Sequence, residues 1–142
     1  MLIPGQFWGI PLLNGTYACG RVIQVHPKGV VGACVMFLAG LLDWNSSNLP
    51  TSDSIAGAAC IEQGDAHLKT ILENGREILG CRPLEKDGIE PWVFRGASFW
   101  RNSFVQRGLI DIRPQTPDDD DLPVLHGWGY KVISIRAEDH FG

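Results

Sequence analysis

The dipeptide Asn14-Gly15 lies between two apolar runs and constrains the fold more than any other feature of the sequence. Both residue types tolerate the positive φ angles of a type I′ turn, which joins antiparallel strands with the correct twist. A turn made of these two residues sets Gly9 opposite Gly20. The other expected pairs are Leu12 with Tyr17, Ile10 with Cys19, Trp8 with Arg21 and Phe7 with Val22. Residues 4–25 are therefore predicted to form a β-hairpin that is thin or sharply bent at the two glycines.

A second apolar run, residues 30–38, has no polar interruption and follows residues 26–29, which have the composition of a turn. Periodicity does not separate strand from helix here, but the β-branched residues and the preceding hairpin favour a central strand covered on both faces. The apolar stretch continues only to Leu42, and its thirteen residues are too few to cross a bilayer. The sequence thus predicts a three-stranded antiparallel meander in the first third of the chain.

The later part of the chain has the pattern of short elements separated by turns. One helix is predicted, because Asp65 is a suitable N-cap and the apolar residues after it have helical spacing up to Asn74-Gly75. Those apolar residues are Leu68, Ile71 and Leu72. Strands are expected at residues 76–81, 91–94, 109–113 and 128–136, a polar loop at 43–54, an exposed loop at 115–123 and a frayed tail from 138.

The composition is that of one domain spanning residues 1–142. Its 17 glycines and 9 prolines indicate many turns, so we expect an α+β, β-rich fold. The expected architecture is a strongly curled antiparallel sheet or a partly open barrel, with an N-terminal meander and one or two short helices. The net charge of −4 and the absence of a basic run argue against binding to nucleic acid.

The spacing and surroundings of the cysteines indicate the cellular compartment of the protein. Four cysteines stand far apart in apolar surroundings without a CxxC pair: Cys19, Cys34, Cys60 and Cys81. They are expected to be buried thiols rather than a disulfide framework. Because the sequence also has no recognisable signal peptide and no membrane span, a cytoplasmic location is predicted.

The sequence contains no signature of catalysis. There is no GxSxG, HExxH, P-loop or GxGxxG motif. Two conceivable groups of metal ligands, Asp65 with His67 and the aspartate run at 118–121 with His126, lack the spacing of known sites, because four contiguous aspartates cannot all point at one ion. The chain is therefore predicted not to be an enzyme and to hold no cofactor or metal.

Two segments, GQFWGIPL at residues 5–12 and GTYACGRV at 15–22, resemble the opening of the immunity protein 26 family, antidotes from bacterial polymorphic toxin systems. A third segment, GREILG at 75–80, is similar to the middle motif of that family, although Glu77 stands where a tryptophan is expected. The resemblance implies a small cytoplasmic protein that neutralises a cognate toxin by binding it and has no catalytic activity. It assigns no contact residues, and the motif residues are best interpreted as determinants of the fold.

We select candidate residues for contact with a partner protein by their negative charge or their aromatic side chains. The candidates are Asp118, Asp119, Asp120, Asp121, Trp100 and Trp128. An acidic loop complements a basic toxin such as a nuclease, and it equally fits a solvated linker with no partner. The alternative function is a small-molecule or peptide-binding module with a pocket lined by Trp8, Phe37 and Trp100. A third possibility is a structural subunit of a larger assembly, and the oligomeric state is left open.

Overall fold

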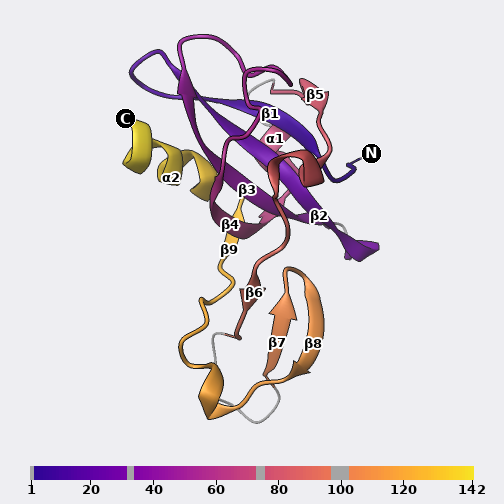
Figure 1. Cartoon of the computed structure of the whole chain (residues 1–142). Coiled ribbons are helices and arrows are strands. Elements are labelled where there is room, and N and C mark those ends of the chain that lie inside the picture. The colour runs from indigo at the N-terminus through magenta and orange to yellow at the C-terminus, as the bar shows by residue number, and fades with distance from the viewer. Residues whose placement is uncertain (1, 32–33, 73–75, 97–102) are drawn as a thin grey trace.

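The computed structural model describes residues 2–31, 34–72, 76–96 and 103–142, which form two sheets and two helices (Figure 1). The larger sheet has the strand order β5-β1-β2-β3-β4-β9, and the smaller one has the order β6-β7-β8. The large sheet consists of β1 (Gln6–Pro11), β2 (Tyr17–Val31), β3 (Cys34–Ser46), β4 (Cys60–His67), β5 (Gly80–Cys81) and β9 (Gly127–Gly129). The small sheet consists of β6 (Val93–Phe94), β7 (Phe104–Arg107) and β8 (Ile110–Pro114), and the helices are α1 (Lys69–Leu72) and α2 (Val132–Phe141).

The small sheet forms a separate lobe beneath the rest of the molecule (Figure 1). We call residues 93–126 the lobe and the remaining described residues the body. The chain enters the lobe through β6 and leaves it toward β9, which pairs in parallel with β4, whereas the other paired strands of both sheets are antiparallel. The tip of the β7–β8 hairpin docks on the body, where the Leu109 N–H donates to Gln24 Oε1 at 2.7 Å and the Gly108 N–H to the Trp92 carbonyl at 2.8 Å.

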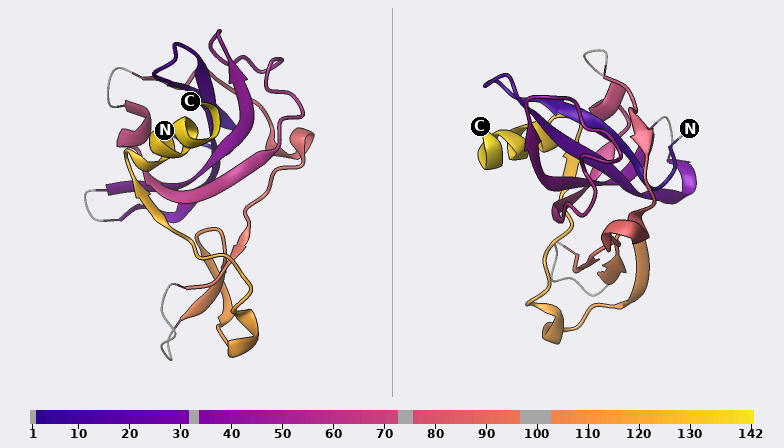
Figure 2. Two further views of the ribbon diagram at one scale, coloured as in Figure 1. Left: turned by 90° about the vertical axis from the view of Figure 1, so that its left-hand side faces the viewer. Right: turned by 45° about the horizontal axis from the view of Figure 1, so that its top comes forward.

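The large sheet is buried on both faces, and β3 is its central strand. Alternate residues of β3 face opposite sides, so Phe37 and Leu41 belong to one core and Leu38 and Leu42 to the other. α2 lies across the first face (Figure 2), where Ile133 and Ala137 are fully buried. The second core is completed by Phe7, Cys19, Ile23, Ile55, Ile89 and Phe94. The predicted antiparallel meander with a doubly covered central strand is confirmed in its strand order. The bounds of the third strand were wrong, because Val30 and Val31 of the predicted strand 30–38 belong to β2 and pair with β3.

The register of the first hairpin is one residue away from the predicted one. The strands pair Trp8 with Gly20 and Gly9 with Cys19, so the two glycines do not face each other and Trp8 does not face Arg21. The other pairs are Phe7 with Arg21, Ile10 with Ala18 and Pro11 with Tyr17. The cause is a three-residue loop in which the Gly15 N–H donates to the Leu12 carbonyl and Gly15 has φ 87°, in place of a two-residue turn. The Trp8 indole lies over Gly20, at a spot where any larger residue would collide with it.

Two turn and loop predictions were wrong in their boundaries. Residues 26–29 do not end a strand but lie within the fifteen-residue strand β2. Their turn-like composition is accommodated by an irregularity, because the register with β3 shifts between Val25 and Val30. Similarly, the polar segment 43–54 begins as part of β3, which continues to Ser46 before the loop starts.

The helix predictions were only partly correct. Asp65 is not an N-cap, because it lies inside β4, a strand that the sequence did not predict, and α1 is a single turn. Asn74 and Gly75 lie outside the described residues. Residues 128–136 were expected as a strand with a frayed tail, but Val132–Phe141 is a ten-residue helix. The apolar residues Ile133, Ala137 and Phe141 recur every four positions, and this helical period continues into the segment taken for a tail.

The C-terminal segment is anchored rather than frayed. Glu138 Oε1 accepts a hydrogen bond from the Leu13 N–H at 2.6 Å, and the Phe141 carbonyl accepts one from Asn14 Nδ2 at 3.1 Å. The α+β, β-rich class is confirmed. The curled sheet or barrel is not: neither sheet closes among the described residues, and the large sheet is open, with β5 and β9 at its edges.

Candidate partner-binding site

The predicted aspartate run begins in a short 3₁₀ turn, Pro117–Asp119, which starts three residues after the end of β8 in the lobe. Asp118, Asp120 and Asp121 are exposed and form no ion pair with any described residue. Asp119 does not belong to an exposed row, because it is 5 % exposed and holds the turn together. Three carboxylates of the predicted site are therefore available to a partner and one is structural.

Asp119 is fixed by Arg113 and by Thr116. Arg113 Nη2 and Nη1 bind its two carboxylate oxygens at 2.5 Å and 2.8 Å, and the Thr116 N–H donates to Oδ2 at 2.8 Å, which completes a capping box. These hydrogen bonds, from Arg113 first, hold the pKa of Asp119 well below the usual range of an aspartate. Asp119 thus remains ionised and fixes the turn beside the end of β8.

The two predicted tryptophans have different outcomes. Trp128 is 3 % exposed and lies on Gly64 of β4, where the absence of a side chain makes room for the indole. It is a core residue in this structure. Trp100 lies outside the described residues.

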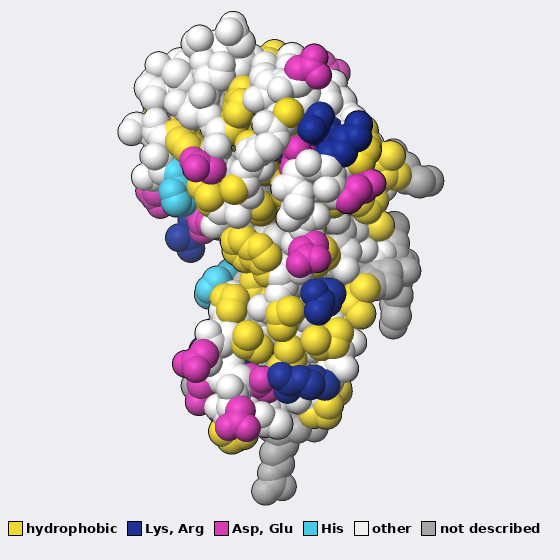
Figure 3. All heavy atoms as spheres, in the orientation of Figure 1, with side chains coloured by type: hydrophobic (Ala, Val, Ile, Leu, Met, Phe, Trp, Pro, Cys, Tyr) yellow, Lys and Arg dark blue, Asp and Glu magenta, His cyan; other side chains and the backbone are white. Residues whose placement is uncertain are grey.

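The lobe exposes large apolar side chains that the sequence analysis did not select. Phe104 is 41 % exposed on β7, and Ile110 and Ile112 are 45 % and 47 % exposed on β8. Hydrophobic side chains accordingly appear on the face of the lobe in Figure 3, with acidic side chains at its lower left. The alternation of residues 109–113 predicted a strand correctly, but pattern alone does not tell which residues of a small sheet are left uncovered.

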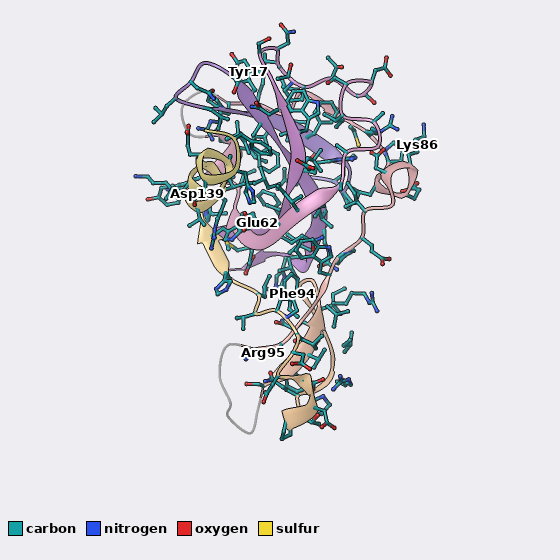
Figure 4. The ribbon with its side chains drawn as sticks, turned by 60° about the vertical axis from the view of Figure 1, so that its left-hand side comes forward. Tyr17, Glu62, Lys86, Phe94, Arg95 and Asp139 are labelled. Atoms are coloured by element: carbon teal, nitrogen blue, oxygen red, sulfur yellow. The ribbon has the colours of Figure 1, made fainter. Side chains whose placement is uncertain are left out.

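A groove of about 260 Å³ lies where the lobe joins the body. Its lining includes aromatic and charged side chains: Trp92, Phe94, Trp128, Glu62, His126 and Arg136. Figure 4 shows Phe94 at this junction, below Glu62 on β4. Glu62 is already bound, with His140 Nε2 at 2.8 Å and Arg136 Nε at 3.6 Å from its two oxygens. The carboxylate in this groove therefore already has an arginine and a histidine as neighbours.

The pocket expected for the small-molecule alternative was to be lined by Trp8 and Phe37. These two side chains are fully buried and contact each other edge to face, with ring centroids 5.9 Å apart. They are members of the core beneath α2. Their packing stabilises the fold, since a buried aromatic pair contributes about 0.5–1.5 kcal/mol beyond its buried area.

A buried cluster of charges in the body was not recognised from the sequence. Arg21 Nη1 lies 2.8 Å from Asp87 Oδ2, Arg82 Nε lies 2.9 Å from the same oxygen, and the Gly57 N–H donates to Oδ1. Burial opposes ionisation of Asp87, but the hydrogen bonds from Arg82, Gly57 and Arg21 outweigh it and lower its pKa to about 2. Arg21 also donates to the carbonyls of Gly5 and Arg82. These bonds join β1, β2 and the segment after β5, so the cluster is structural.

Two of the thiols, Cys19 and Cys60, are protonated at neutral pH and are not nucleophiles. Burial raises the pKa of Cys19 to about 12 and that of Cys60 to about 11, so both remain protonated. Cys81 is exposed, contrary to the expectation of a buried thiol. Among the described residues no three histidine, cysteine or acidic side chains come close enough to hold a metal ion. None of the helices in that part of the chain has the length and apolarity needed to span a membrane.

A family model described as Immunity protein 26 matches residues 3–94, nearly two-thirds of the chain. The chain belongs to the immunity protein 26 family. Membership makes it an immunity protein against a toxin, and a protein without catalytic activity. Comparisons with curated proteins and with solved structures gave no match.

The family match is located almost entirely in the body. It contains the opening motif at residues 5–22, which forms β1 and the start of β2 and includes the buried residues Phe7, Trp8, Ile10, Arg21 and Val22. It ends at Phe94 in β6, so β7, β8, the aspartate turn, β9 and α2 lie beyond it. The exposed carboxylates and the exposed apolar residues of the lobe are therefore all outside the matched region.

Proposed function

We propose that this immunity protein neutralises one cognate bacterial toxin by binding it in the cytoplasm, and that the lobe supplies much of the contact surface. The observation that carries the proposal is the division of the chain: the family match covers β1 to β6, whereas the lobe beyond it combines exposed Phe104, Ile110 and Ile112 with Asp118, Asp120 and Asp121, which form no ion pair with a described residue. Apolar residues next to charged ones are typical of surfaces that bind proteins.

The charges favour a basic toxin. Asp118, Asp120 and Asp121 form no ion pair with a described residue, and Arg113, the nearest arginine in the sequence, is already bound to Asp119. A basic protein surface would be attracted to this turn over about 10 Å at moderate salt, which would raise the rate of association. A toxin that acts on nucleic acid has a basic surface of this kind, and such a toxin belongs to the proposal.

The proposal predicts that a toxin gene lies beside the gene for this chain, and it is tested with the domain of that toxin that arrests growth. Expression of that domain in a bacterial host should stop growth, and co-expression of this chain should restore it. Titration calorimetry with the purified pair should give a one-to-one complex. An unrelated immunity protein of similar size and charge serves as the control. Growth arrest that co-expression does not relieve, or a pair that does not bind, would contradict the proposal.

A further inference from the structure

β8 is an exposed strand edge in the lobe. The order β6-β7-β8 leaves one side of β8 without a neighbouring strand among the described residues, and all five of its residues are exposed. An exposed strand edge presents free N–H and C=O groups that can pair with a strand of another chain. Because Pro114 has no N–H, the part of this edge with backbone donors is Ile110 to Arg113.

The other strands at the ends of the two sheets are shorter and offer fewer backbone groups for pairing. β5 and β6 have two residues each, and β9 has three, of which the central one, Trp128, is turned into the core. β8 is longer than any of them and carries two exposed isoleucines, Ile110 and Ile112. Phe104 of β7 adds a third exposed apolar side chain opposite Pro114 at the end of the same hairpin. Among the described residues, β8 is therefore the longest of the strands that end a sheet, and three exposed apolar side chains lie on it or beside it.

Charge at this edge indicates what kind of strand it fits. Asp111 lies within β8, and the turn that carries Asp118, Asp120 and Asp121 begins three residues after the strand. The Arg113–Asp119 ion pair joins the end of β8 to that turn, so these carboxylates are held at the end of the edge. None of the four has an ion pair with a described residue. A strand that binds here meets apolar side chains along β8, Arg107 of β7 opposite Ile110 at one end, and an excess of carboxylates at the other end next to the turn.

We infer that the toxin contributes an extended segment, apolar and basic in character, that pairs with β8 and adds a strand to the small sheet. This inference rests on the proposed function and specifies the contact within it. Backbone hydrogen bonds along Ile110 to Arg113 would hold the segment, whereas Ile110, Ile112 and the carboxylates would select it. Family members that share the body could then differ in partner through this one strand and the turn after it.

The first test changes the edge without touching the core. The double variant Ile110→Lys/Ile112→Lys keeps the strand but removes its apolar surface and repels a basic segment. The matched control is Leu72→Lys/Ile135→Lys, which makes the same chemical change at two body residues that are 57 % and 58 % exposed. Calorimetry with the toxin domain should show binding at least about tenfold weaker for the edge variant and within about twofold of the natural chain for the control.

The second test follows the backbone. Hydrogen exchange should slow by at least about tenfold in the complex at those amides of residues 110–113 that point away from β7, because the added strand pairs with them. Tight binding with unchanged exchange at these amides, or an edge variant that binds as the natural chain does, would overturn the inference alone. A toxin domain that does not bind at all would overturn the proposed function and the inference with it. A dimer of the isolated chain that the edge variant abolishes would assign the edge to a second copy instead.

Discussion

The body and the lobe are built on different principles. The body buries both faces of its sheet, places Trp8 over Gly20 and Trp128 over Gly64, and encloses the ion cluster of Arg21. The lobe has few fully buried residues, such as Val105 and Phe94, and leaves β8 exposed along its whole length. A substitution in the body should therefore change folding, and one on the lobe should change binding with little change in folding.

This contrast fits the extent of the family match. Positions that bury a ring against a glycine, or an arginine against an aspartate, tolerate few side chains, because interiors are close-packed and buried charges need partners. Exposed positions on a small sheet tolerate many. The matched region contains Phe7, Trp8 and Arg21, which are constrained by packing, and the exposed residues of the lobe lie beyond it. The buried residues of β9 and α2, such as Trp128 and Ile133, also lie beyond it.

The largest expected effect comes from breaking the buried ion cluster of the body. Arg21→Met leaves Asp87 with a weaker set of partners in a buried site and removes the donors to the Gly5 and Arg82 carbonyls. Removal of one partner of a buried ion pair costs about 3–5 kcal/mol. Urea unfolding should show a loss of this size. The matched control is Arg107→Met on the exposed surface of the lobe, which should change stability by less than about 0.5 kcal/mol.

A smaller effect is expected where an indole lies on a glycine. Gly20→Val introduces a side chain into the space occupied by the Trp8 ring, and overpacking of this kind costs about 1–3 kcal/mol. Thermal unfolding should therefore occur at a lower temperature than in the natural protein. Gly127→Ala is the control and should change the melting temperature little, since an added methyl group at Gly127 has no neighbour within 4 Å and its φ is not positive. A melting temperature for Gly20→Val equal to that of the natural chain would place the indole elsewhere.

Acid should loosen the lobe through Asp119. Its pKa in the folded protein lies well below the unfolded value of about 3.9, so its ionised form stabilises the turn at pH values above that value. This stabilisation is lost as the pH falls through the lowered folded pKa. We expect hydrogen exchange in residues 115–122 to be slow at pH 5 and to rise relative to the body only in strong acid. Asp119→Asn should raise that exchange already at neutral pH, with the body unchanged.

The sequence predicted the architecture where long apolar runs specify it. The N-terminal meander follows from such runs and from the glycine-containing turn, although one residue in the turn shifted every pair. The register was missed because Asn14-Gly15 fits a two-residue and a three-residue loop equally well, and only packing of Trp8 on Gly20 distinguishes them. β4 was missed because its residues, CIEQGDAH, have no clear alternation. α2 was missed because a short stretch at 128–136 matches both periods.

The candidate site was predictable in part for a similar reason. The aspartate run in the sequence predicts an exposed turn. The ion pair between Asp119 and Arg113 is not predictable in the same way, because it depends on where β8 ends. Likewise, the exposure of Ile110 and Ile112 depends on β8 being the edge strand, which is a property of strand order and not of local pattern. Cluster residues such as Arg21 and Asp87 are 66 positions apart, and a single sequence gives no signal for such a pair.

The smallest expected effect comes from a variant that separates the contribution of the charged turn to toxin binding from that of the apolar edge of β8. Asp118→Asn/Asp120→Asn removes two exposed carboxylates but keeps Asp119 and the turn that it holds. At low salt the toxin should bind about two- to tenfold more weakly, and the slope of affinity against salt should flatten, because exposed charges act mainly on association and are screened. The control, Glu77→Gln/Asp139→Asn, removes the same charge from the body and should leave that slope nearly unchanged. Unchanged affinity of the lobe variant at low salt would show that the turn is a solvated linker, and would leave the apolar edge of β8 as the main contact of the lobe.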